Sequence, residues 1–96
     1  MRHASRVDAN QAQVISALEA AGARVWVLGL PVDLLVGYQG RWLLVEVKDG
    51  AKPPSDRRMT PLQVEFFKWS EGYPRALVDS PEAALRVLGV LGSADR

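Results

Sequence analysis

The chain has 96 residues, of which 48% are hydrophobic and 24% are charged, and its formal net charge is +1. This length suits one domain, and so high an apolar content argues against an intrinsically disordered chain. No apolar run approaches the ~20 residues that span a bilayer, and residues 1–10 lack the apolar stretch of a secretion signal. We therefore expect no membrane association and one domain over residues 8–92, between short tails at 1–7 and 93–96.

The absence of some residue types limits the kinds of catalytic and metal-binding sites that the chain can form. The chain has no cysteine, and His3 is its single histidine. These counts exclude disulfides, a thiol nucleophile, histidine-based triads and zinc sites built on either residue. The absence of cysteine also fits a reducing cytoplasm. Any catalysis must therefore use carboxylates, lysines, hydroxyls and a hard metal ion.

The pattern of apolar and turn-forming residues predicts an α/β fold with the order α-β-β-β-α-β-α and a mixed four-stranded sheet flanked by helices. Asp8 and Gln11 form a potential capping box for the first helix, and Thr60 and Gln63 form one for the second. Gln39-Gly40 is expected to be the two-residue turn of a hairpin. The expected helices are 9–21, 61–72 and 81–91, and the expected strands are 24–28, 32–38, 41–48 and 75–78.

The hairpin over residues 32–48 carries the most informative pattern. With a two-residue turn, one of its faces is wholly apolar, and the other places Asp33 opposite Glu46. Lys48 lies two residues beyond Glu46, and therefore on the same face. Directly opposed residues have Cβ atoms ~4.5–5.5 Å apart, where like charges are destabilising. A divalent cation would offset this repulsion, and oxygen ligands suit Mg²⁺ or Mn²⁺.

These three side chains suit the metal-assisted hydrolysis of a phosphodiester. The two acids would hold the metal, a metal-bound water would be the nucleophile, and Lys48 would orient that water or stabilise charge on the phosphate. A structural interpretation stays open, in which Asp33 caps a turn and Glu46 simply pairs with a cation. A one-residue slip of the register would put the two acids on opposite faces.

Four short motifs carry a resemblance to a known family. PVDLLVG and VEVK, with Asp33, Glu46 and Lys48, resemble the signature of PD-(D/E)xK nucleases. RVDANQ, VDLLVGYQGR, VEVKDGAKPPS and MTPLQ, in this order, are similar to small phage and prophage nucleases of the VRR-NUC type, which are relatives of archaeal Holliday-junction resolvases. The resemblance runs from Arg6 to Leu88. It implies a restriction-endonuclease-like αβββαβ core, here with an extra C-terminal helix.

The resemblance also implies a function. It predicts a Mg²⁺-dependent DNA endonuclease, in which Mn²⁺ substitutes and no small-molecule cofactor takes part, in the cytoplasm of a bacterial or phage-infected cell. Asp33, Glu46 and the Val47 backbone carbonyl would bind the metal, and Asp33, Glu46 and Lys48 would be catalytic. Branched DNA such as a Holliday junction is the expected substrate. A nickase or flap nuclease of the same fold and a non-catalytic DNA-binding module are the alternatives.

The sequence departs from the family pattern near the metal site. An extra residue separates the proline of the signature from Asp33, and the first helix offers Gln11 and Gln13 where related nucleases often carry a glutamate. Asp8, Gln11 and Gln63 are therefore candidate auxiliary residues of the site. The capping boxes are an alternative explanation for all three.

The loop over residues 49–59 is rich in turn-forming and basic residues. Lys52, Arg57 and Arg58 are expected to contact DNA phosphates beside the metal. An ordinary solvated loop is the alternative, because the chain as a whole has 12 basic and 11 acidic residues.

The last expected helix is apolar nearly all round, which calls for burial on more than one side. Leu85, Leu88 and Leu91 share one side, and Val87 and Val90 lie on another. So short a chain has little core to offer this helix, so we expect a symmetric homodimer, the commonest soluble oligomer. A poorly packed C-terminus is the alternative. The large aromatic residues are expected mostly in the core, with base stacking less favoured: Trp26, Trp42, Phe66, Phe67 and Trp69.

Overall fold

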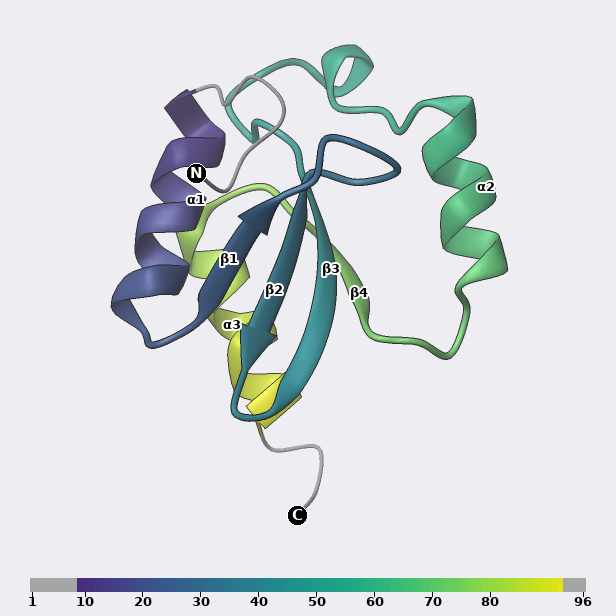
Figure 1. Cartoon of the computed structure of the whole chain (residues 1–96). Coiled ribbons are helices and arrows are strands. Elements are labelled where there is room, and N and C mark those ends of the chain that lie inside the picture. The colour runs from purple at the N-terminus through teal and green to yellow at the C-terminus, as the bar shows by residue number, and fades with distance from the viewer. Residues whose placement is uncertain (1–8, 93–96) are drawn as a thin grey trace.

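A computed structural model describes residues 9–92, without the side chain of Asp56, and its elements follow the predicted order (Figure 1). Asp8 and both predicted tails lie outside the described residues. The described chain forms α1 (Ala9–Ala20), β1 (Arg24–Val27), β2 (Leu34–Tyr38), β3 (Arg41–Val47), the 3₁₀ turn η1 (Pro54–Asp56), α2 (Pro61–Trp69), β4 (Arg75–Val78) and α3 (Pro81–Gly92).

The four strands form one mixed sheet in the order β1-β2-β3-β4. β1, β2 and β3 are antiparallel neighbours, whereas β4 runs parallel to β3. The hairpin has the predicted register, with Leu34 opposite Val45. Its turn residues Gln39 and Gly40 both have positive φ angles, 51° and 80°, as a type I′ turn requires. The predicted α/β class, mixed sheet and hairpin are therefore confirmed.

β2 begins at Leu34, two residues later than predicted. Its pairing with β3 ends there because a side chain takes over from the backbone. The Val47 N–H donates to the Asp33 side chain at 2.8 Å, while the Asp33 carbonyl accepts from the Leu28 N–H at 2.8 Å. The residue that ends the β2–β3 pairing is thus one of the two predicted acids.

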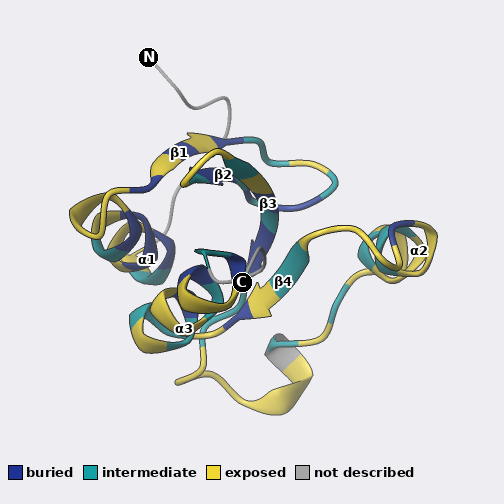
Figure 2. Ribbon diagram, turned by 90° about the horizontal axis from the view of Figure 1, so that it is seen from below, coloured by how far each residue is buried: buried dark blue, intermediate teal, exposed yellow. Residues whose placement is uncertain are grey.

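The two faces of the sheet are covered differently. α1 and α3 lie side by side within the curve of the sheet, on what we call its inner face (Figure 2). α2 lies on the opposite, outer side and stands apart from the strands in both views (Figures 1 and 2). Alternate strand residues point inward, and the core lies between the inner face and the two helices: Val14, Ile15, Leu18, Ala23, Val25, Val27, Leu34, Val36, Leu43, Val45, Val78, Ala84, Leu88 and Leu91.

The expectation that the aromatic residues lie mostly in the core is wrong for the tryptophans. Trp26, Trp42 and Trp69 are 52%, 60% and 80% exposed. Trp26 and Trp42 occupy strand positions that alternate with the core residues and so point to the outer face, and Trp69 belongs to α2. Phe66 and Phe67 are half-buried.

α3 buries one side and leaves another open. Ala84, Leu88 and Leu91 enter the core, whereas Leu85 and Val90 are exposed. One layer of contacts thus covers only part of a helix that is apolar nearly all round, as expected. Among the described residues, no helix is long and apolar enough to cross a bilayer.

Candidate active site

Glu46 lies near the end of β3, and its side chain is only 3% exposed. Burial raises the pKa of its carboxyl above the ordinary glutamate value, and the charge of Asp33 and a side-chain hydrogen bond with Asp33 raise it too. The hydrogen bond and charge of Lys48 act in the opposite direction but do not cancel the rise. The two acids are therefore close neighbours, as the predicted register requires.

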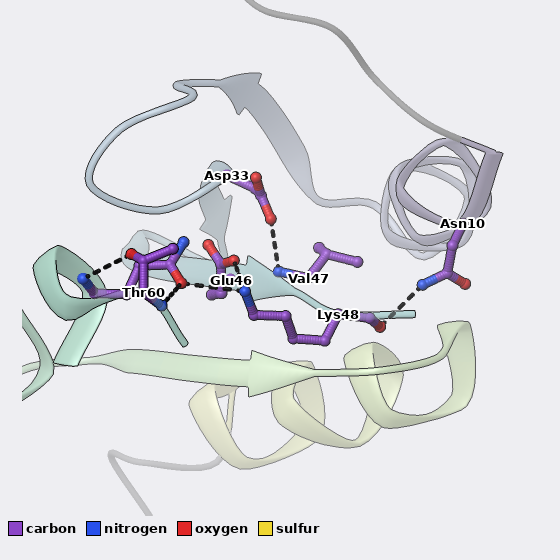
Figure 3. A network of polar contacts seen from close by, with 7 residues as sticks. Asn10, Asp33, Glu46, Val47, Lys48 and Thr60 are labelled. Atoms are coloured by element: carbon purple, nitrogen blue, oxygen red, sulfur yellow. Dashed lines mark hydrogen bonds and ion pairs between the residues drawn. The ribbon is translucent and has the colours of Figure 1, made fainter. Parts of the chain in front are cut away.

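Asp33 approaches from the loop before β2 and points toward the end of β3 (Figure 3). Its Oδ2 accepts the Val47 N–H at 2.8 Å, so the acid caps the end of the hairpin pairing. A carboxylate has about four lone-pair sites, so this hydrogen bond does not use all of the acceptor capacity of Asp33. Asp33 can hold its position through Val47 and still offer oxygen to a cation.

Lys48 is held from two sides. Its Nζ lies 3.0 Å from Glu46 Oε2 and donates to Gln63 Oε1 at 3.1 Å. The same Gln63 oxygen accepts the Thr60 N–H at 3.0 Å, and the Gln63 N–H donates to Thr60 Oγ1 at 3.3 Å. The second predicted capping box is therefore confirmed. Gln63 is at once a helix cap and a neighbour of the site, so its two interpretations do not compete.

α1 joins the site through a residue that the sequence reasoning missed. Asn10 Nδ2 donates to the Lys48 backbone carbonyl at 3.0 Å (Figure 3). Gln11, the predicted auxiliary residue, is buried in the same turn of α1. Asp8, the other candidate here, lies outside the described residues. The sequence signal for Asn10 is its place inside the RVDANQ motif, next to Gln11.

The three predicted phosphate-contacting residues of the loop lie in different environments. Lys52 and Arg58 are exposed. Arg57 follows η1 and lines a pocket of about 240 Å³ together with Lys48 and Asp79. Its Nε is buried and has no hydrogen-bond partner among the described residues. An unpaired buried donor is costly, so Arg57 is the one of the three that is built to meet an acceptor.

The donor set around the two acids fits a hard cation. Among the residues that the structure describes, no three Asp, Glu, His or Cys side chains gather into a metal-binding group. Mg²⁺, however, usually takes one or two carboxylates and keeps several waters. Glu46 Oε1 is buried without a hydrogen-bond partner among the described residues. In a strand, the N–H and C=O of one residue point to the same side, so the Val47 carbonyl also faces Asp33.

Comparisons with protein-family models, with curated proteins and with solved structures find no match to this chain.

Proposed function

We propose that this chain is a Mg²⁺-dependent DNA endonuclease with a restriction-endonuclease-like αβββαβ core. One observation carries the proposal: the buried carboxyl of Glu46 is a close neighbour of Asp33 and lies 3.0 Å from the Lys48 ammonium. Two neighbouring carboxylates with an adjacent lysine are the groups that metal-assisted phosphodiester hydrolysis requires. The resemblance to PD-(D/E)xK nucleases supports the same assignment of these three residues.

Each residue of the site has a distinct role in this proposal. Asp33, Glu46 and the Val47 carbonyl would hold Mg²⁺ or Mn²⁺, and the cation would supply Lewis-acid activation of a water molecule and of the scissile phosphate. The Lys48 ammonium orients the attacking water or stabilises charge on the phosphate. Gln63 would keep that ammonium in place, because it accepts from Nζ independently of Glu46. Asn10 fixes the backbone of Lys48 from α1.

The proposed substrate is branched DNA such as a Holliday junction, cut by a homodimer that carries two such sites. A strand of DNA that reaches the metal would place a neighbouring phosphate in the pocket of Lys48 and Arg57. The exposed cations Lys52 and Arg58 would add attraction for phosphates of any DNA shape.

The assignment is tested by incubating the purified chain with labelled junction, flap and duplex DNA, with Mg²⁺, with Mn²⁺ or with EDTA. We expect cleavage that needs the metal and is fastest on the junction. Paired cuts across the junction separate a resolvase from a nickase or flap nuclease. Binding without any metal-dependent cleavage would identify the non-catalytic module instead.

The matched variants are Glu46→Gln and Glu82→Gln, which make the same chemical change at a buried site residue and at an exposed residue of α3. Glu46→Gln is expected to abolish cleavage, as is Asp33→Asn, because each removes a charged oxygen ligand. Glu82→Gln should cut normally. Circular dichroism checks that all variants fold, and normal cutting by Glu46→Gln would falsify the metal-site proposal.

A further inference from the structure

Away from Glu46 and Lys48, the outer face of the sheet carries several apolar side chains that no element within residues 9–92 fully buries. Trp26, Trp42 and Leu77 are 52%, 60% and 48% exposed. Leu35 and Leu44 lie between them on β2 and β3 and are half-buried. Monomeric proteins seldom leave a contiguous apolar patch of this kind in water, and such patches mark interaction sites.

The one helix on the outer side is itself only partly covered. Every residue of α2 is described, and none is buried. Its attachments to the rest of the chain are polar: Gln63 accepts from Lys48 at its start, and Arg75 Nη2 donates to the Phe67 carbonyl at 2.7 Å near its end. The exposed apolar residues in and just after the helix are Leu62, Val64, Trp69 and Tyr73.

We propose that a second copy of this chain covers the outer face, so that the apolar side of α2 and the outer sheet of each copy are buried in a twofold dimer. One chain thus carries both halves of the contact, which is the self-complementarity that a twofold interface needs. The sheet offers three exposed apolar side chains and the α2 segment four; four of the seven are aromatic, and each aromatic side chain can bury about 150–250 Å². A stable interface needs about 800 Å² from each partner.

Charge on this surface is of both signs. Glu65 in α2 and Glu71 just after it are exposed and would repel a phosphate backbone, but Lys68 in α2 is exposed as well. On the sheet, leucines lie beside Trp26, and the exposed Arg24 shares the outer face with Trp42, across Gly37. A base-stacking platform instead interleaves aromatic rings with a positively charged groove. Stacked bases are therefore an outcome that the test must be able to detect.

All three tryptophans of the chain lie on the proposed interface, so its own fluorescence reports on assembly. We expect sedimentation to show a dimer at micromolar concentration. Tryptophan emission should shift to longer wavelength on dilution, over the same concentration range in which the dimer dissociates. These measurements are made without DNA or metal, so their result is independent of the proposed nuclease function.

Two variants place a charge in the interface, and a third places the same charge elsewhere. Trp69→Glu changes a residue that is 80% exposed, so it should leave the fold intact and yield a monomer; Trp42→Glu should do the same from the sheet. Val90→Glu, at a residue of α3 that is 72% exposed, is the matched control and should remain a dimer. Because Trp42 packs over Gly37, Trp69→Glu decides the matter if Trp42→Glu fails to fold.

Three results would overturn the proposal. A wild-type monomer at every concentration removes the interface. A dimer that only Val90→Glu dissociates moves it to α3, as the apolar helix first suggested. Emission that responds to a single-stranded oligonucleotide and not to protein concentration makes the outer face a platform for bases. Glu46→Gln should stay dimeric, which separates this test from that of catalysis.

Discussion

The two faces of the sheet are formed by alternate residues of the same strands, but they have different roles. The inner face meets α1 and α3 and is sealed, with Leu34, Val36 and Val45 at 0–2% exposure. The outer face carries the two acids and Lys48 at one end and uncovered tryptophans over the rest. Adjacent residues of β3 therefore have different roles: Val45 packs in the core, and Glu46 belongs to the candidate site. In so thin a domain, stability and function are divided by face rather than by segment.

The sharpest way to break this comparison is to remove the same side chain from each face. Leu34→Ala on the inner face should lower the free energy of unfolding by about 2–5 kcal/mol, because the residue is fully buried. Leu35→Ala, its neighbour on the outer face, should cost clearly less. Guanidinium unfolding at low protein concentration, where no dimer adds to stability, compares the two. Equal losses would mean that the outer face is as well packed as the inner one.

A second comparison, on the outer side, is between Arg57, which lines the pocket beside Lys48, and the exposed Arg58. Arg57→Gln should weaken DNA binding by about 10- to 150-fold, since a hydrogen bond to a charged group is worth about 1.5–3 kcal/mol. It should also flatten the slope of log K against log salt by ~0.9. Arg58→Gln, which removes the same charge from an exposed neighbour, should change both much less. If the two variants behave alike, the pocket beside Lys48 is not a phosphate site.

The smallest expected effect is the pH dependence of stability that Glu46 causes. Its pKa in the folded chain is raised, chiefly by burial. The folded state therefore holds this proton more tightly than the unfolded state does. The resulting stabilisation is complete below the ordinary glutamate pKa of about 4.3, and it is lost as pH rises through the higher folded value.

Without metal, the Glu46→Gln variant does not lose stability in this way as pH rises, because glutamine does not ionise. Its free energy of unfolding, relative to wild type, should therefore increase with pH across that window and then level off. Denaturant unfolding from pH 4 to pH 8, with Glu82→Gln as the flat control, measures the difference. A difference that does not vary with pH would show that Glu46 keeps an ordinary pKa. With Mg²⁺ present, the trend should reverse, because the cation favours the ionised carboxylate of wild type.

The sequence by itself determined the order of the elements and the register of the hairpin. Both follow from short-range chemistry: Gln39-Gly40 accepts the positive φ angles of a tight turn, and strand alternation then puts Asp33 beside Glu46. The capping box of Thr60 and Gln63 is local in the same sense. These features could be predicted because each depends on residues that are close in the chain or joined by one turn.

Only the tertiary structure decided which apolar face is covered. Both faces of β2 and β3 carry leucines, so alternation alone cannot tell which one receives α1 and α3, and the tryptophans fell on the open face. The contacts of Lys48 with Asn10 and Gln63, and the buried Nε of Arg57, arise where α1, α2 and η1 meet the end of β3. Such meetings depend on how helices pack in three dimensions, because the residues involved lie far apart along the chain.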